Sequence, residues 1–120
     1  MSWDVYVSSD KNHPEPIDVE CHSGGGTYAV DGVPSAELNV TYNYSREFRK
    51  ALGRGFRDLH GKHVKDILPL LKEAVKTLGT EQDSDYWKAT PGNAGHALNI
   101  LAGWCRQAID GGQDAWLLIF

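Results

Sequence analysis

The chain has 120 residues, of which 41% are hydrophobic and 23% are charged, and its formal net charge at pH 7 is −4. This length and composition are those of one ordinary globular domain, so we expect residues 1–120 to form a single domain and exclude an intrinsically disordered chain. The negative charge argues against a general nucleic-acid-binding protein.

No part of the sequence resembles a membrane-spanning or export segment. No apolar run approaches the roughly 18 residues that cross a bilayer, and the first residues lack the basic and apolar regions of a secretory signal. We therefore expect a cytoplasmic protein with no membrane partner. Cys21 and Cys105 form no Cys-x-x-Cys pair, and in that compartment we expect buried thiols rather than a disulfide or metal ligands.

Alternating polar and apolar residues predict strands within the first 42 residues. The alternation covers residues 3–7 and 17–21, with a polar turn between them, which predicts an antiparallel hairpin with an acidic outer surface. A short second hairpin over residues 27–33 would turn at Asp31-Gly32, a dipeptide that favours tight turns. Residues 38–42 alternate again and predict a third strand.

Apolar residues at helical spacing then predict two helices in the middle of the chain. The first begins at Ser45, which is a suitable N-cap residue, and ends at Gly53. The second spans residues 64–78 and contains Pro69. This helix therefore either begins late enough to hold the proline in its first turn, or is kinked there.

The end of the chain predicts a third helix and a last strand. The helix follows the cap Thr90, with Pro91 in its first turn and Asn93 as a competing cap, and ends near Gly111. Residues 115–120 are apolar on both faces, which predicts a strand in the middle of the sheet.

The order of these elements predicts the α+β class, because the strands are grouped rather than alternating with helices. We expect a small, mostly antiparallel sheet made of the N-terminal hairpin, the third strand and a central C-terminal strand. Two or three helices would pack on one of its faces. A sheet this small exposes an edge, which leaves homo-oligomerisation open.

Several short motifs occur in a distinctive order along the chain. They are Ser-Trp-Asp-Val at 2–5, Asn-Val-Thr-Tyr-Asn-Tyr-Ser at 39–45, Arg-Lys-Ala-Leu-Gly at 49–53 and Arg-Asp-Leu-His-Gly-Lys at 57–62. With the proline-containing helix that follows, they make the chain resemble a group of small uncharacterised proteins encoded by bacteriophages and prophages. The resemblance does not include residues 24–35. It implies a setting, an accessory phage protein in the host cytoplasm, and no reaction.

The segment from residue 39 to 57 is the candidate ligand site. Its candidate binding residues are Asn39, Thr41, Asn43, Ser45, Arg46, Arg49, Arg54 and Arg57. A helix start offers unpaired N–H groups to an anion, and arginine adds bidentate donors for phosphate. Tyr42 or Tyr44 could stack on a base. The alternative is a strand-to-helix junction whose polar side chains bind local backbone and whose arginines pair with the acidic hairpin.

A second candidate surface is the acidic loop before the third helix, which carries Tyr86 and Trp87. Exposed aromatic residues anchor protein partners, and the alternative is that both rings form a lid on the core. Asp18 and Glu20 share one face of a predicted strand and could form a carboxylate pair, but we favour a solvated strand edge.

No pattern predicts a catalytic residue, a metal ion or another cofactor. The histidines have no metal-ligand spacing, and the run at Gly24 lacks the Lys-Ser or Lys-Thr of a phosphate-binding loop. Our main hypothesis is therefore a non-enzymatic accessory protein that sequesters an anionic or nucleotide-derived ligand to counter host defence. The alternatives are an interaction module that inhibits a host protein and a small enzyme of unrecognised type.

Overall fold

Five antiparallel strands form one sheet in the computed structural model of the chain, which describes residues 2–19, 27–29, 35–85 and 87–120. The strands are β1 (Ser2–Ser8), β2 (Thr27–Ala29), β3 (Glu37–Thr41), β4 (Lys62–His63) and β5 (Trp116–Ile119). Their order across the sheet is β2-β3-β1-β5-β4. The predicted α+β class is confirmed.

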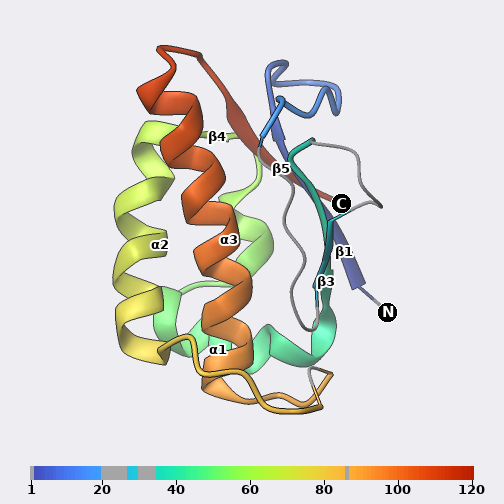
Figure 1. The fold of residues 1–120 in the computed structure, drawn as a ribbon, viewed down its shortest axis with the longest axis vertical. Coiled ribbons are helices and arrows are strands. Elements are labelled where there is room, and N and C mark those ends of the chain that lie inside the picture. The colour runs from blue at the N-terminus through green and yellow to red at the C-terminus, as the bar shows by residue number, and fades with distance from the viewer. Residues whose placement is uncertain (1, 20–26, 30–34, 86) are drawn as a thin grey trace.

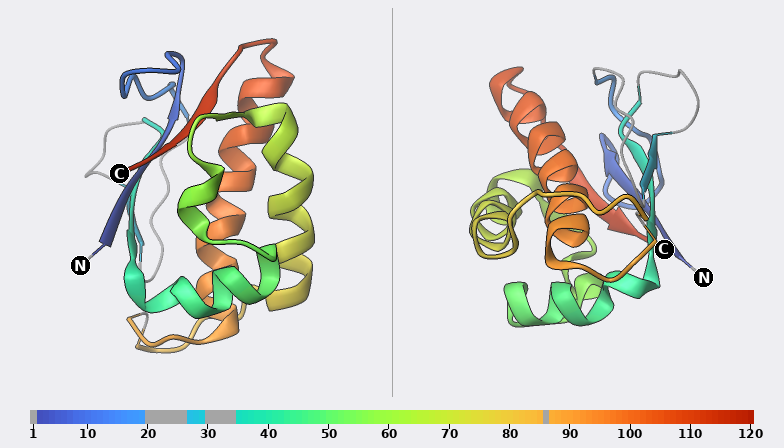
Figure 2. Two further views of the ribbon diagram at one scale, coloured as in Figure 1. Left: turned by 180° about the vertical axis from the view of Figure 1, so that it is seen from behind. Right: turned by 60° about the horizontal axis from the view of Figure 1, so that its bottom comes forward.

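Three helices cover one face of this sheet (Figures 1 and 2). They are α1 (Ser45–Leu52), α2 (Val64–Leu78) and α3 (Pro91–Asp110), and the short 3-10 helices η1 (Tyr42–Tyr44) and η2 (Phe56–Leu59) flank α1. Helices α2 and α3 run side by side along the sheet, and α1 lies at one end of the molecule (Figure 1). None of the described helices has the length and apolar character to span a membrane.

The register of β1 explains the core. Val5 pairs with Leu38 on one side and with Ile119 on the other, so alternate residues of three strands point toward the helices. These buried strand residues are Val5, Val7, Leu38, Val40, Leu117 and Ile119. They pack with the apolar stripes of α2 and α3, which include Ile67, Leu71, Leu98 and Trp104. As predicted, β5 is an interior strand.

The N-terminal hairpin is shorter than the alternation predicts. Residues 16–19 return antiparallel to β1, but they form only isolated bridges, Ser8 with Pro16 and Asp18 with Ser35. The reason is that β3 and β5 occupy the two edges of β1. Residues 20 and 21 of the predicted strand and the predicted turn at residues 31–32 lie outside the described residues. Residues 27–29 do form a strand, and they pair with β3.

The helix ends follow local rules with two differences. Ser45 is the first residue of α1 rather than its N-cap, because η1 precedes it and the Ser45 hydroxyl donates to the Tyr42 carbonyl across 2.6 Å. Helix α2 begins at Val64, so Pro69 lies beyond its first turn. Of the two alternatives for this proline, a helix that begins late enough to hold it in the first turn is therefore wrong. Thr90 caps α3 as predicted, since its hydroxyl accepts from the Asn93 N–H across 3.1 Å.

Candidate functional site

A cavity of about 250 Å³ lies between α1, η2 and β1, and we call it the α1–η2 cavity. Its lining residues are Trp3, Ser45, Arg49, Gly55, Phe56, Arg57 and Asp58. Three of the predicted ligand-binding residues, Ser45, Arg49 and Arg57, therefore meet in one concave site.

Aromatic rings form an apolar wall of this cavity. Phe56 is buried, and its ring centroid lies 5.0 Å from that of Trp3 and 4.7 Å from that of Phe48. Trp3 also contacts Tyr42 edge to face at 4.7 Å, and the Tyr42 side chain is 41% exposed. The rings hold one another in place, so this wall is pre-formed.

Two arginines supply the positive charge of the cavity. Arg57 is anchored, because its Nε donates to the Ile119 carbonyl across 3.3 Å. This bond leaves both terminal nitrogens of its guanidinium group for other partners. A terminal nitrogen of Arg49 lies 3.4 Å from the position that a Cβ on Gly55 would take. This distance is an ordinary van der Waals contact, so the Arg49 guanidinium group lies beside the turn at Gly55.

Asp58 places one carboxylate in the same cavity. Its Oδ2 accepts from the Gly55 N–H across 3.1 Å, which fixes the turn before η2. Within the described part of the chain, the ion pairs of 4.0 Å or less join only His63 to Asp114 and Lys88 to Asp83. The cavity thus carries two guanidinium groups against one carboxylate, and neither arginine is neutralised by a described ion pair.

A second cavity of about 160 Å³ borders the other flank of α1, and we call it the α1–α3 cavity. Its lining residues are Arg46, Glu47, Lys50, Thr77, Leu78 and Pro91. The Oε2 atom of Glu47 is buried without a hydrogen-bond donor, so this part of the carboxylate faces protein. Arg46 and Lys50 are both exposed.

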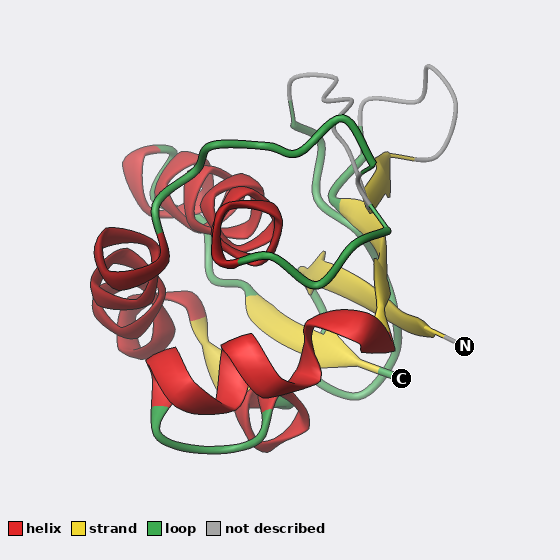
Figure 3. Ribbon diagram, turned by 90° about the horizontal axis from the view of Figure 1, so that it is seen from below, coloured by secondary structure: helices red, strands yellow, loops and turns green. Residues whose placement is uncertain are grey.

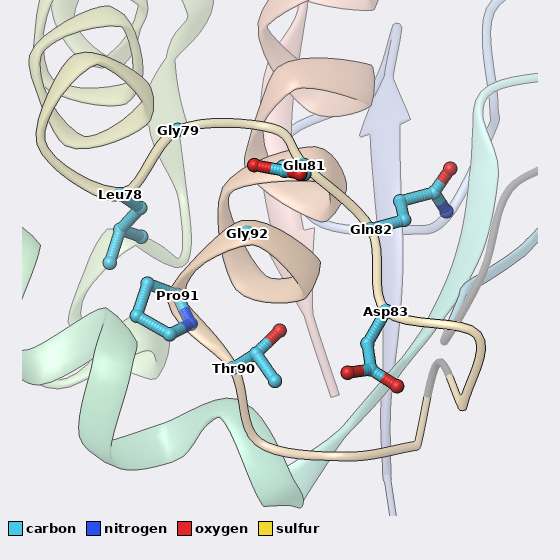
Figure 4. A pocket seen from close by; sticks show the side chains of 8 residues that line it. All are labelled: Leu78, Gly79, Glu81, Gln82, Asp83, Thr90, Pro91 and Gly92. Carbon is cyan, nitrogen blue, oxygen red and sulfur yellow. The ribbon is translucent and has the colours of Figure 1, made fainter.

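A third cavity, of about 400 Å³, lies where residues 78–83 cross the start of α3 (Figure 4). It is lined by the carboxylates of Glu81 and Asp83 and by no lysine or arginine. Although it is larger than the two cavities beside α1, this acidic lining repels an anion.

Asn39 and Thr41, two of the other predicted ligand-binding residues, lie outside these cavities and have structural roles. Asn39 donates to Ser2 and to Asp4 across 2.8 and 3.0 Å. The buried Thr41 hydroxyl accepts from the Asn43 N–H across 3.2 Å. These two residues fit the alternative interpretation, in which polar side chains bind local groups.

Asn43 and Arg54, which were also predicted to bind the ligand, lie outside the cavities beside α1. The Asn43 side chain donates to the Trp87 carbonyl across 2.8 Å, so it ties η1 to the loop before α3. Arg54 is exposed and lines neither of the cavities beside α1. It follows Gly53, whose φ of +72° turns the chain away from the axis of α1.

The loop before α3 is held by a residue whose role the sequence analysis did not identify. Asn93 is fully buried, and its side chain accepts from the Asp83 N–H and donates to the carbonyls of Asp85 and Lys88. Trp87 lies in this loop with 41% of its surface exposed. Tyr86 lies outside the described residues.

The described histidines of the η2 region are bound to backbone groups. His60 accepts the Ile119 N–H on Nδ1 across 2.8 Å. His63 accepts the Lys65 N–H on Nδ1 and contacts Asp114 through Nε2 at 2.9 Å. Both Nδ1 atoms are thus acceptors for amide hydrogens. Among the described residues, no three His, Cys, Asp or Glu side chains are grouped to hold a metal ion.

Cys105 is a buried thiol, as expected. Burial raises its pKa from 9.0 to about 12, so the reactive thiolate is absent at neutral pH. Burial also raises the pKa of Tyr44 to about 12, with a smaller contribution from the charge of Asp85. Cys21, Glu20 and the glycines at 24–26 lie outside the described residues, whereas Asp18 is exposed.

Comparison with known proteins gives one partial similarity. No family model and no solved structure matches the chain. Over 76 residues, or 63% of its length, the chain is 37% identical to 4-hydroxy-3-methylbut-2-enyl diphosphate reductase of Caldanaerobacter subterraneus subsp. tengcongensis. The chain spans 24% of that enzyme, which is too little to assign the chain to its family.

Proposed function

We propose that this protein is a non-enzymatic binding protein that takes an anionic ligand in the α1–η2 cavity. One observation carries the proposal. Arg49 and Arg57 line the same cavity, and no described carboxylate forms an ion pair with either. Unpaired guanidinium groups in a concave site are suited to bind phosphate or carboxylate with two parallel hydrogen bonds.

The other walls of the cavity narrow the kind of ligand. The volume of about 250 Å³ is smaller than that of sites for drug-sized ligands, so it suits one anionic group with a small attached body. The Ser45 hydroxyl already donates to Tyr42 and is left to accept a hydrogen from the ligand. The exposed ring of Tyr42 beside Trp3 offers a stacking surface at the rim, which favours a nucleotide.

The setting is the accessory phage protein that the sequence motifs imply. In a host cell, a protein that binds a host-made nucleotide signal without converting it would lower the free concentration of that signal. This is how we expect the protein to counter host defence. The diphosphate in the name of the partial relative is also an anion, but the match spans only 24% of that enzyme and the proposal does not rest on it.

Calorimetry with a panel of nucleotides and inorganic phosphate tests the proposal. We expect the change of Arg49→Gln to weaken binding at least about tenfold, because it removes a charge-assisted hydrogen bond. Arg54→Gln is the matched control, since this exposed arginine belongs to the same basic segment but lies outside the cavity. Equal losses of affinity in the two variants, or no binding of any compound in the panel, would overturn the proposal.

A second candidate function is inhibition of a host protein through the loop that carries Trp87. It is favoured by the 41% exposure of this side chain on a loop that Asn93 and Asn43 hold in place, because a rigid exposed aromatic residue is a suitable interface anchor. We expect Trp87→Ala to abolish one-to-one binding of a purified host partner. Phe120→Ala, at an exposed aromatic residue outside the loop, should retain it.

A further inference from the structure

We infer that the ligand carries two anionic groups, one for each of the cavities beside α1. This inference rests on the proposed function and extends it to the ligand class. Besides the α1–η2 cavity with Arg49 and Arg57, the adjoining flank of α1 has the α1–α3 cavity with Arg46 and Lys50. A ligand with two anionic groups would cross the exposed side of the helix and reach both.

The positions of these residues on α1 set the geometry. Residues four apart lie on one side of a helix, so Ser45 and Arg49 border one cavity, whereas Arg46 and Lys50 border the other. The exposed surface of α1 lies between them. This end of the molecule faces the reader in Figure 3. The two pairs are one residue, or about 100°, apart around the helix, so the two anionic groups lie closer together than the helix width of about 10 Å.

The charge of the α1–α3 cavity supports an anion there. Arg46 and Lys50 form no ion pair within the described ranges of the chain. Glu47 also lines this cavity, but its Oε2 is covered by protein. Two cations against one carboxylate leave the lining with a net positive charge. A volume of about 160 Å³ leaves room for a phosphate group.

These sizes point to a nucleotide with a second phosphate away from the first, rather than to a diphosphate chain. Two directly linked phosphates lie too close together to occupy both flanks of a helix. Adenosine 3′,5′-bisphosphate is a suitable probe, and adenosine 5′-monophosphate is its matched control because the two differ by one phosphate.

Calorimetry at low salt with the intact protein tests the inference. We expect the bisphosphate to bind at least about tenfold more tightly than the monophosphate. Lys50→Gln should reduce the affinity for the bisphosphate to that for the monophosphate, and should change the affinity for the monophosphate by less than about twofold. Arg49→Gln should weaken both probes, and Arg54→Gln should weaken neither. Circular dichroism checks that each variant is folded.

The outcomes separate this inference from the proposed function. If Lys50→Gln weakens both probes equally, or neither, while Arg49→Gln weakens both, the two-group ligand is wrong and the anion site stands. If Arg49→Gln has no effect on either probe, or if neither probe binds, both ideas fail. A single-stranded oligonucleotide could instead bind more tightly than either probe, with equal dependence on Arg46, Arg49 and Lys50. That result would mean that the ligand is a nucleic acid and not a small molecule.

Discussion

Asn93 binds the loop that precedes its own helix, with its Oδ1 accepting the backbone N–H of Asp83 across 2.9 Å. The same side chain donates from Nδ2 to the carbonyls of Asp85 and Lys88, across 3.1 and 2.9 Å. One buried amide therefore satisfies three backbone groups of the acidic loop. Because Trp87 lies between the two bound carbonyls, Asn93 also holds the backbone from which the exposed indole projects.

We expect Asn93→Ala to lower the free energy of unfolding by about 2–4 kcal/mol, because the change leaves backbone groups of the loop without partners. Urea unfolding measures this loss. Asn99→Ala is the matched control, since Asn99 is an exposed asparagine of the same helix, and its effect should stay within about 0.5 kcal/mol. Equal effects of the two changes would show that Asn93 does not anchor the loop.

Two glycines of α3 should respond to alanine with opposite signs. A Cβ on Gly95 would lie 1.7 Å from the Gly79 carbonyl oxygen, whereas a Cβ on Gly103 would have nothing within 4 Å. We expect Gly95→Ala to destabilise the protein by at least about 2 kcal/mol or to prevent folding. Gly103→Ala should stabilise it by about 0.5–1 kcal/mol, since alanine favours the helix. Thermal unfolding of both variants measures these changes in stability. A lower stability of the Gly103→Ala variant would contradict the prediction.

Alkaline pH should destabilise the protein partly through Cys105. Burial raises the pKa of this thiol from 9.0 to about 12. Between these values the unfolded chain releases the proton and the folded chain retains it. The free energy of unfolding therefore falls as pH rises above 9, by up to about 1.4 kcal/mol per pH unit for this group. Cys105→Ala should show a shallower fall between pH 9 and 11 in urea unfolding, and parallel curves would refute the role of the thiol.

Local sequence patterns predicted the helices and the interior strand because their determinants are local. The apolar stripe over residues 64–78 predicts α2, and Gly79 marks its end. Thr90 and Pro91 mark the start of α3. In the C-terminal strand, Leu117 and Ile119 face the helices, and Leu118 on the other face of the sheet is buried as well. The alternation over residues 17–21 predicted that one face of this segment is buried, and Ile17 and Val19 are buried. It could not predict that other strands already pair with both edges of β1.

The candidate site was predicted as a set of residues but not as a geometry. The sequence places the arginines in one segment, whereas the turn at Gly53 after α1 decides which of them meet. Asn39 and Thr41 looked equivalent to Ser45, yet they bind groups on the sheet and on η1. The contacts of Asn39 join residues that are 35 or 37 positions apart along the chain, so no spacing rule reveals them, whereas the Thr41 contact is local. The buried Asn93 had one local signal, its place in the first turn of α3.

Asp58 gives the last test, because it is the carboxylate that opposes an anion in the α1–η2 cavity. Asp58→Asn removes this charge and keeps an oxygen that can accept the Gly55 N–H. We expect the variant to bind an anionic nucleotide about fivefold more tightly, as the removal of a nearby like charge predicts. Asp66→Asn, at an exposed carboxylate of α2 outside the cavity, should leave the affinity unchanged. Calorimetry compares the two, and weaker binding by Asp58→Asn in a folded protein would mean that the ligand donates a hydrogen to this carboxylate instead of being repelled by it.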